Sequence, residues 1–126
     1  MQAEVFQPPM AARESQVLAL LGHFYLKQGY AQRAITVFAA LEILDPHNAS
    51  HVRAHALACH RAGRLEQALA CLDRLALRGR INAPYHLLRA RVLQGLVRPQ
   101  EAAKAMRAYV QAVKQGEFPV DAEHAW

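Results

Sequence analysis

The 126-residue chain is poor in serine and has no cluster of glycines, two features on which many enzyme sites depend. Its only serines are Ser15 and Ser50, and neither lies in a strand-to-helix elbow or near an obvious base, so nucleophilic catalysis lacks its parts. The six glycines are dispersed along the chain and form no phosphate-binding loop. We therefore predict that the protein is not an enzyme and carries no nucleotide cofactor.

Long apolar runs are also missing. No stretch approaches the roughly 18 apolar residues that a membrane span requires. The first residues, MQAEVFQPPMAARES, contain no basic region followed by an apolar run, so a signal peptide is not expected. Together these absences predict a cytoplasmic protein, in which Cys59 and Cys71 stay reduced and lie buried inside helices.

What the chain does contain is alanine, leucine and positive charge. Hydrophobic residues make up 53% of it, and scarce Ser, Thr and Asn leave a composition that favours helices over a sheet. Fifteen Lys and Arg face ten Asp and Glu, giving a formal charge of +5. This excess favours an anionic partner, which could be an acidic protein segment, a nucleic acid or a membrane surface.

Internal repetition organises the sequence. A small residue recurs every 34 positions, and a large apolar residue follows it four positions later. Two further series, one small and one apolar, keep the same register and indicate three copies of one unit. The four series are Ala34, Ala68 and Ala102; Phe38, Leu72 and Met106; Gly22, Ala56 and Ala90; and Tyr25, Cys59 and Leu93.

Each unit is predicted to be a helix, a short turn and a second helix. The first helix shows the three-and-four spacing of an amphipathic helix at Val17, Leu18, Leu21, Phe24 and Tyr25, and is expected to stop near Gly29. Proline and glycine mark the other boundaries. The remaining helices are predicted at 31–44, 49–62, 65–78, 84–94 and 99–115. This predicts an all-α domain over 15–116, with units at 15–48, 49–82 and 83–116, an N-terminal extension (1–14) and a C-terminal tail (117–126).

The first unit resembles the tetratricopeptide repeat (TPR), because it carries Leu21-Gly22, Tyr25, Ala34, Phe38 and Pro46 on that motif's signature positions. The resemblance implies a right-handed superhelix of helix pairs. The later units depart from the motif: His55 and Arg89 replace the usual leucine, and Gly95 comes two places early in the third turn.

Three such repeats in a short chain resemble the small chaperones of bacterial type III secretion. The stretch from Leu20 through Pro46 is most similar to the YscY (SctY) family. That resemblance implies a cytosolic chaperone that binds a small secreted protein of the YscX type before export, and the client complex could then reach the export apparatus. Chaperones of needle or translocator subunits use the same repeat and remain alternatives.

The family resemblance also implies where a partner binds, since the first helix of each repeat lines the concave surface. Leucines between cationic groups suit an amphipathic helix or an extended segment with acidic flanks. The implied partner-binding residues are Leu20, His23, Lys27, Arg53, Leu57, His60, Arg61, Leu87, Leu88 and Arg91. The Lys, Asn and Arg clamp that captures a free carboxyl terminus in some members is absent, with Ala19, His23, Ala54, Pro84 and Leu88 at its positions.

Other readings of the sequence receive less support. His51 and His55 stand four apart and could begin a metal site, but no cysteine or carboxylate completes it nearby in the sequence, and no metal is predicted. Nucleic-acid binding is suggested by a run of arginines, but acidic residues interrupt it and exposed aromatics for base stacking are lacking. A scaffold or adaptor within another complex remains a further alternative.

Overall fold

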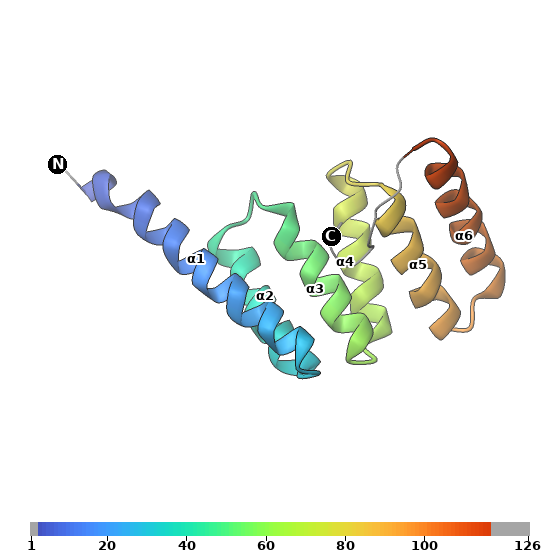
Figure 1. The fold of residues 1–126 in the computed structure, drawn as a ribbon, viewed down its shortest axis with the longest axis horizontal. Coiled ribbons are helices and arrows are strands. Elements are labelled where there is room, and N and C mark those ends of the chain that lie inside the picture. The colour runs from blue at the N-terminus through green and yellow to red at the C-terminus, as the bar shows by residue number, and fades with distance from the viewer. Residues whose placement is uncertain (1–2, 117–126) are drawn as a thin grey trace.

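The computed structural model describes residues 3–116, with side chains from residue 12 onward, and shows six α-helices and no strand within that part of the chain (Figure 1). The predicted all-α class is therefore confirmed. The helices are α1 (Ala3–Lys27), α2 (Ala31–Leu44), α3 (Ala49–Arg61), α4 (Leu65–Leu77), α5 (Ala83–Gly95) and α6 (Pro99–Lys114). Among these residues, no helix is both long and apolar enough to cross a membrane.

The helix boundaries agree with the sequence predictions to within one residue from α2 to α6. The first helix differs, because α1 begins at Ala3 and takes in most of the segment predicted as an N-terminal extension (1–14). Pro8 and Pro9 lie in its second turn and remove two backbone donors without ending it. The predicted C-terminal tail, 117–126, lies outside the described residues.

Helices that follow one another in the chain pack against one another. The main contacts join α1 to α2, α3 to α4 and α5 to α6, and α2 also packs closely on α3, whereas α4 meets α5 less extensively. Figure 1 shows the result as a row of helices with α1 at one end and α6 at the other. Such a row shares one elongated core, since no single pair could bury its apolar faces alone.

Small residues allow the paired helices to approach closely, as the repeat spacing predicted. Ala34, Phe38, Ala68 and Leu72 are all 0% exposed. A Cβ atom added to Gly22 of α1 would lie 2.6 Å from the ring of Phe38 of α2, so the crossing has no room for a larger side chain. The spacing in the first two units is therefore a packing rule.

The third unit packs differently. Ala102 is only half-buried and Met106 is 40% exposed, although both were predicted in the same register as their buried counterparts. Within the described residues no helix follows α6, so the outer side of this pair has nothing to cover it. The core there is a small cluster of Ala90, Leu93 and Ala105.

The turns inside the three helix pairs are closed by the same hydrogen bond. In the first turn the amide of Tyr30 donates to the carbonyl of Tyr25 over 2.8 Å. The same bond joins Arg64 to Cys59 over 2.8 Å in the second turn and Arg98 to Leu93 over 2.9 Å in the third. This bond belongs to a helix end that needs one residue in the left-handed conformation. Gly29 and Gly63 fill that position, and in the third turn Val97 fills it, with φ of 59°. The early Gly95 is the last residue of α5 and packs against Leu65 instead.

Candidate partner-binding surface

The ten residues predicted to bind a partner all lie on α1, α3 and α5, the first helices of the three pairs. Electrostatic effects between helices show that parts of this set lie close together. His51 on α3 influences His23 on α1, and Arg91 on α5 influences His60 on α3. The three helices therefore contribute neighbouring groups to one face, which we call the first-helix face.

Positive charge and burial shape the histidines of this face. Burial lowers the pKa of His60 below its ordinary 6.5, and the nearby Arg91 and Arg61 lower it further. Partial burial of the ring likewise lowers the pKa of His23, although the residue as a whole is exposed, and His51 makes a smaller contribution. The His23 ring also stands edge-on to Phe38, with ring centroids 5.1 Å apart. The surroundings of both imidazoles therefore favour their neutral form.

The exposure of the predicted residues divides them into three groups. Leu88 is only 6% exposed and belongs to the core, so it offers no surface to a partner and is removed from the candidate surface. The half-buried residues are Arg53, Leu57, His60 and Leu87, and the exposed residues are Leu20, His23, Lys27, Arg61 and Arg91. The remaining nine residues form a face that mixes leucine with cationic groups.

An exposed apolar stripe on α1 was not predicted as part of the site. It consists of Val17, Leu20, Leu21 and Phe24, whose exposed fractions are 65%, 72%, 38% and 54%. The spacing of Val17, Leu21 and Phe24 predicted an amphipathic helix, and Leu20 alone of the stripe was predicted to bind a partner. In the structure α1 instead buries the neighbouring Gly22 and Leu26, and leaves the stripe uncovered by described residues.

The stripe adjoins the cationic part of the first-helix face. Successive residues of an α-helix are rotated by about 100°, so Val17, Leu20, Leu21 and Phe24 share an arc of about 100°. Lys27 and His23 follow directly on the side of Leu20, and both are exposed. Helix α1 therefore presents an apolar surface with a cationic border, and Leu20 lies where the two meet. Sequence spacing alone could have located this arc, but not its exposure.

Several arginines that suggested nucleic-acid binding are engaged inside the protein. Arg64, in the turn before α4, donates to the Gln32 side chain over 2.9 Å. On α4, Arg74 donates to Glu42 over 2.8 Å. Arg78, which caps α4, donates to the Pro46 carbonyl over 2.8 Å. Arg89 lies 3.7 Å from Asp73. These contacts hold α4 against α2 and α5, and they reduce the positive charge that is available to a phosphate backbone.

The two histidines considered as the start of a metal site point to different partners. His51 Nε2 lies 3.2 Å from Asp45 Oδ2, whereas His55 Nδ1 contacts Glu42 Oε2 on α2. The two imidazoles therefore do not face a common ligand position. The prediction that no cysteine or carboxylate lies nearby was wrong, because Cys59 follows His55 by one turn on α3 and Cys71 reaches both residues from α4.

Comparison with known proteins gave no match to a protein-family model, a curated protein or a solved structure. The geometry of the described residues is therefore the basis on which a function is proposed. Two features stand out from it: the apolar stripe of α1 with its cationic border, and the cluster of thiols and imidazole around Cys71.

Proposed function

We propose that this protein is a TPR-type binding protein that holds an amphipathic helix or extended segment of a partner protein. More specifically, we propose that it acts as a cytosolic chaperone of the type III secretion class, with a small secreted protein of the YscX type as its client. The client would lie on the first-helix face of a right-handed superhelix and be kept from aggregating until export.

The repeated turn supports the TPR assignment. Three helix ends, at Tyr30, Arg64 and Arg98, use one hydrogen-bond pattern at intervals of 34 residues, which is the length of this repeat. Buried Ala34 and Ala68 beside Phe38 and Leu72 are also what close crossing of paired helices requires. The combination favours three stacked copies of one helix pair.

The observation that carries the binding function is the exposed stripe of Val17, Leu20, Leu21 and Phe24. Four large apolar side chains on adjacent turns of one helix form a patch that water disfavours, and such patches mark interaction sites in soluble proteins. An apolar helix of a partner can cover it in the way that amphipathic helices occupy hydrophobic surfaces elsewhere. In a chaperone–client pair, binding would hide both this patch and the apolar surface of the client from water.

The charged groups beside the stripe favour a client with acidic flanks. Lys27, Arg61 and Arg91 are exposed on the first-helix face, and the chain as a whole carries a formal charge of +5. Carboxylates on the client would fix its register and speed its association, while apolar contacts supply most of the affinity. Half-buried Leu57 and Leu87 extend the apolar contacts onto α3 and α5.

The proposal is tested by tagging the protein in its native cells and recovering what co-purifies. We expect one small protein in equal stoichiometry that is insoluble or unstable when expressed alone. Leu20→Asp and Phe24→Asp should release it, each weakening binding by more than about 2 kcal/mol, as expected for central interface residues. Leu77→Asp is the matched control, since Leu77 is 88% exposed on α4 and should retain the client.

The same experiment distinguishes the alternatives. If the stripe joins two copies of this chain, light scattering will show a dimer that Leu20→Asp dissociates and no client will be recovered. Recovery that depends on nucleic acid and is abolished by nuclease would replace the proposal with nucleic-acid binding. Recovery of a stable, independently folded enzyme would indicate a scaffold.

The predicted contribution of α3 and α5 has its own variants. Leu57→Asp and Leu87→Asp should weaken client binding by more than about 2 kcal/mol if the client extends along the first-helix face. Both side chains are half-buried, so each variant must first be shown to stay folded by its thermal melt. Folded variants that hold the client as tightly as the parent would confine the binding site to α1.

A further inference from the structure

Three potential metal ligands meet between α3 and α4. His55 and Cys59 stand one turn apart on α3, and Cys71 reaches them from α4. One ligand atom from each of the three residues lies within 4.8 Å of the others. The set was not apparent from the sequence, in which twelve positions separate Cys59 from Cys71.

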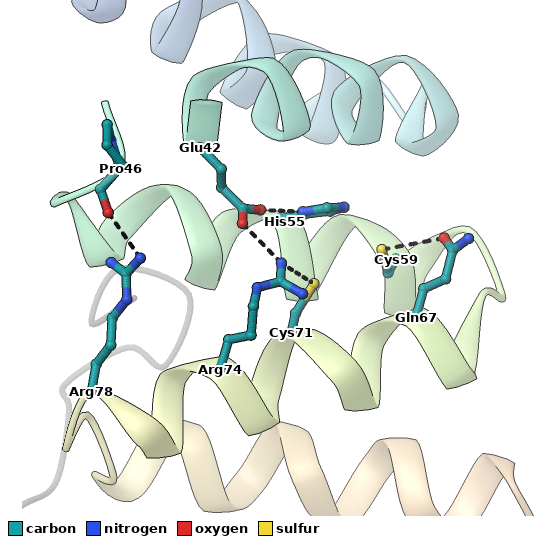
Figure 2. A network of polar contacts seen from close by, with 8 residues as sticks. All are labelled: Glu42, Pro46, His55, Cys59, Gln67, Cys71, Arg74 and Arg78. Atoms are coloured by element: carbon teal, nitrogen blue, oxygen red, sulfur yellow. Dashed lines mark hydrogen bonds and ion pairs between the residues drawn. The ribbon is translucent and has the colours of Figure 1, made fainter. Parts of the chain in front are cut away.

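The two thiols are buried in polar surroundings. Cys59 is 0% and Cys71 is 1% exposed, and neither forms a disulfide. Arg74 donates to Cys71 Sγ over 3.4 Å, and the Cys59 thiol lies 3.9 Å from Gln67 Oε1, to which it donates (Figure 2). Buried cysteines that only fill space are normally surrounded by apolar groups. The Arg74 guanidinium and the His55 imidazole instead give Cys71 a polar setting in which its thiolate can be stabilised, while the Cys59 thiol is placed to donate to the Gln67 side-chain oxygen.

Glu42 of α2 connects the cluster to a third helix. Its Oε2 atom contacts Nδ1 of His55, and its Oε1 atom accepts a hydrogen bond from Arg74 at 2.8 Å (Figure 2). The side chain of Glu42 is 18% exposed, and that of His55 is 15% exposed. A carboxylate that holds one nitrogen of an imidazole and so orients the ring is the usual outer partner of a metal-binding histidine.

We propose that His55, Cys59 and Cys71 bind one Zn²⁺ ion, with Glu42 as the residue that positions His55. Two thiolates and an imidazole are ligands that Zn²⁺ prefers, and three protein ligands leave its fourth position for water. This site is independent of the proposed partner-binding function.

The geometry and the charges both suit a divalent cation. Sulfur atoms at about 2.3 Å from a tetrahedral zinc lie roughly 3.8 Å apart, so ligand atoms within 4.8 Å need to approach by about 1 Å at most. Two thiolates and the Glu42 carboxylate carry three negative charges. The ion and Arg74 carry three positive charges, so the occupied site is neutral, as a buried site should be.

A route to the site is also present. A surface hollow of about 340 Å³ is lined by His55, Cys71, Arg74 and Gln67, together with residues of α2 and α4. The ion can therefore approach Cys71 and His55 from this hollow, whereas Cys59 is 0% exposed and does not line it, so the final ligation requires a local shift of side chains. Binding links α3 directly to α4 and, through Glu42, to α2, so it should stabilise the middle of the helix row.

The experiment is titration of the fully reduced protein with Zn²⁺ alone, in competition with a chromophoric chelator, followed by Co²⁺ as a spectroscopic substitute. We expect one ion per chain, a higher melting temperature in its presence, and thiolate-to-Co²⁺ charge-transfer absorption in the near ultraviolet. Binding should strengthen as pH rises through neutrality, since the two thiols release protons when they ligate the ion.

Variants assign the ligands. His55→Gln, Cys59→Ala and Cys71→Ala should each abolish stoichiometric binding, whereas His51→Gln, one turn earlier on the same helix and bonded to Asp45, should leave it unchanged. Glu42→Gln should lower the affinity roughly 10–100-fold, as expected for an outer partner, while the thiolate absorption of the Co²⁺ complex is retained. A purely structural role for Glu42 would not separate these two readouts.

Three outcomes would overturn the proposal. The reduced and folded protein could fail to take up Zn²⁺, it could bind Zn²⁺ with a Co²⁺ complex that shows no thiolate absorption, or it could lose binding in His51→Gln and retain it in His55→Gln. If the cysteine variants unfold, X-ray absorption at the zinc edge of the parent protein still decides, because the site requires two sulfur ligands.

Discussion

At the scale of single residues, packing in the first two helix pairs depends on side chains that are as small as possible. Gly22 of α1 meets Phe38 of α2 where the two helices cross, Ala34 is buried one turn before Phe38 on α2, and Ala68 is the corresponding residue of α4. Closely packed interiors transmit a change of even one methylene group to their neighbours. The residues with the least side chain are therefore among those that tolerate substitution least.

The clearest test of this packing is Ala68→Leu. Ala68 is 0% exposed, so a leucine must force its neighbours apart, and we expect the free energy of unfolding to fall by about 1–3 kcal/mol. Ala40→Leu on α2 is the matched control, because Ala40 is exposed and its substitution should change stability by less than about 0.5 kcal/mol. Urea denaturation measures both, and equal effects would contradict the packing interpretation.

His60 provides a test of electrostatics on the first-helix face. Burial, Arg91 and Arg61 hold its pKa below 6.5 in the folded protein, so below pH 6.5 the unfolded chain binds a proton at this site more readily than the folded chain. The contribution of His60 to stability is therefore intact above pH 6.5. It is lost progressively as the pH falls toward the pKa of the folded state.

Comparison of the parent with His60→Gln isolates this contribution. The stability difference between the two proteins, measured by urea denaturation at several pH values on both sides of 6.5, should shift in favour of the variant as the pH falls. A difference that is independent of pH, or that shifts in favour of the parent, would show that His60 is not held neutral by its surroundings.

At the scale of elements, the turns inside the helix pairs are alike in hydrogen bonding but not in composition. Gly29 and Gly63 adopt positive φ without strain, whereas Val97 adopts φ of 59° with a β-branched side chain. A left-handed conformation costs a residue with a Cβ atom about 1–2 kcal/mol. The third turn keeps its geometry because α5 and α6, which pack together over their length, hold its two ends.

Replacing Val97 by glycine should therefore stabilise the protein. Val97 is 82% exposed and loses little packing, so relief of strain should exceed the entropy cost of glycine and raise the free energy of unfolding by about 1 kcal/mol. Val110→Gly within α6 is the matched control. There the same substitution should lower stability, because glycine is a poor helix former. Denaturant unfolding of the two variants shows directly whether each substitution raises or lowers the free energy of unfolding.

At the scale of the whole molecule, the described row of helices leaves apolar side chains uncovered at both ends. The stripe of Val17, Leu20, Leu21 and Phe24 lies on α1, while Met106 and Val110 on α6 are 40% and 43% exposed and line a hollow of about 460 Å³. A stack of repeats buries the faces between its units but not the outer faces of its end units. The ends are thus where the fold itself provides binding surface.

Charge on the first-helix face should control how fast a partner arrives. Provided that the proposed client is recovered, Arg61→Glu should slow its association and weaken the dependence of that rate on salt, with less effect on dissociation, because exposed charges act mainly through steering. Arg107→Glu, an equal change of charge at an exposed site on α6, is the control. Stopped-flow mixing at two salt concentrations compares them, and identical rates for the two variants would refute a specific role for Arg61.

The sequence by itself determined the boundaries of α2 to α6 and the residues at the crossings of the first two helix pairs. Breakers such as Pro46 and Gly63 restrict the local backbone, and the recurrence of Ala34 at Ala68 reports a local steric requirement, so both can be read without knowing the fold. The substitution of Val97 for a turn glycine could also have been found in this way, by following the period of 34 instead of the displaced Gly95.

Only the tertiary structure decided which side chains are left exposed and which distant groups meet. Spacing shows that Leu21 and Phe24 share a face of α1, but their exposure depends on where α2 and α3 pack. The tertiary structure also placed Leu88 in the core rather than on the surface. In the same way, Cys71 reaches His55 and Cys59 because α4 folds back along α3, and Glu42 joins them from α2. Contacts between helices depend on how whole elements dock, which no local pattern in the sequence records.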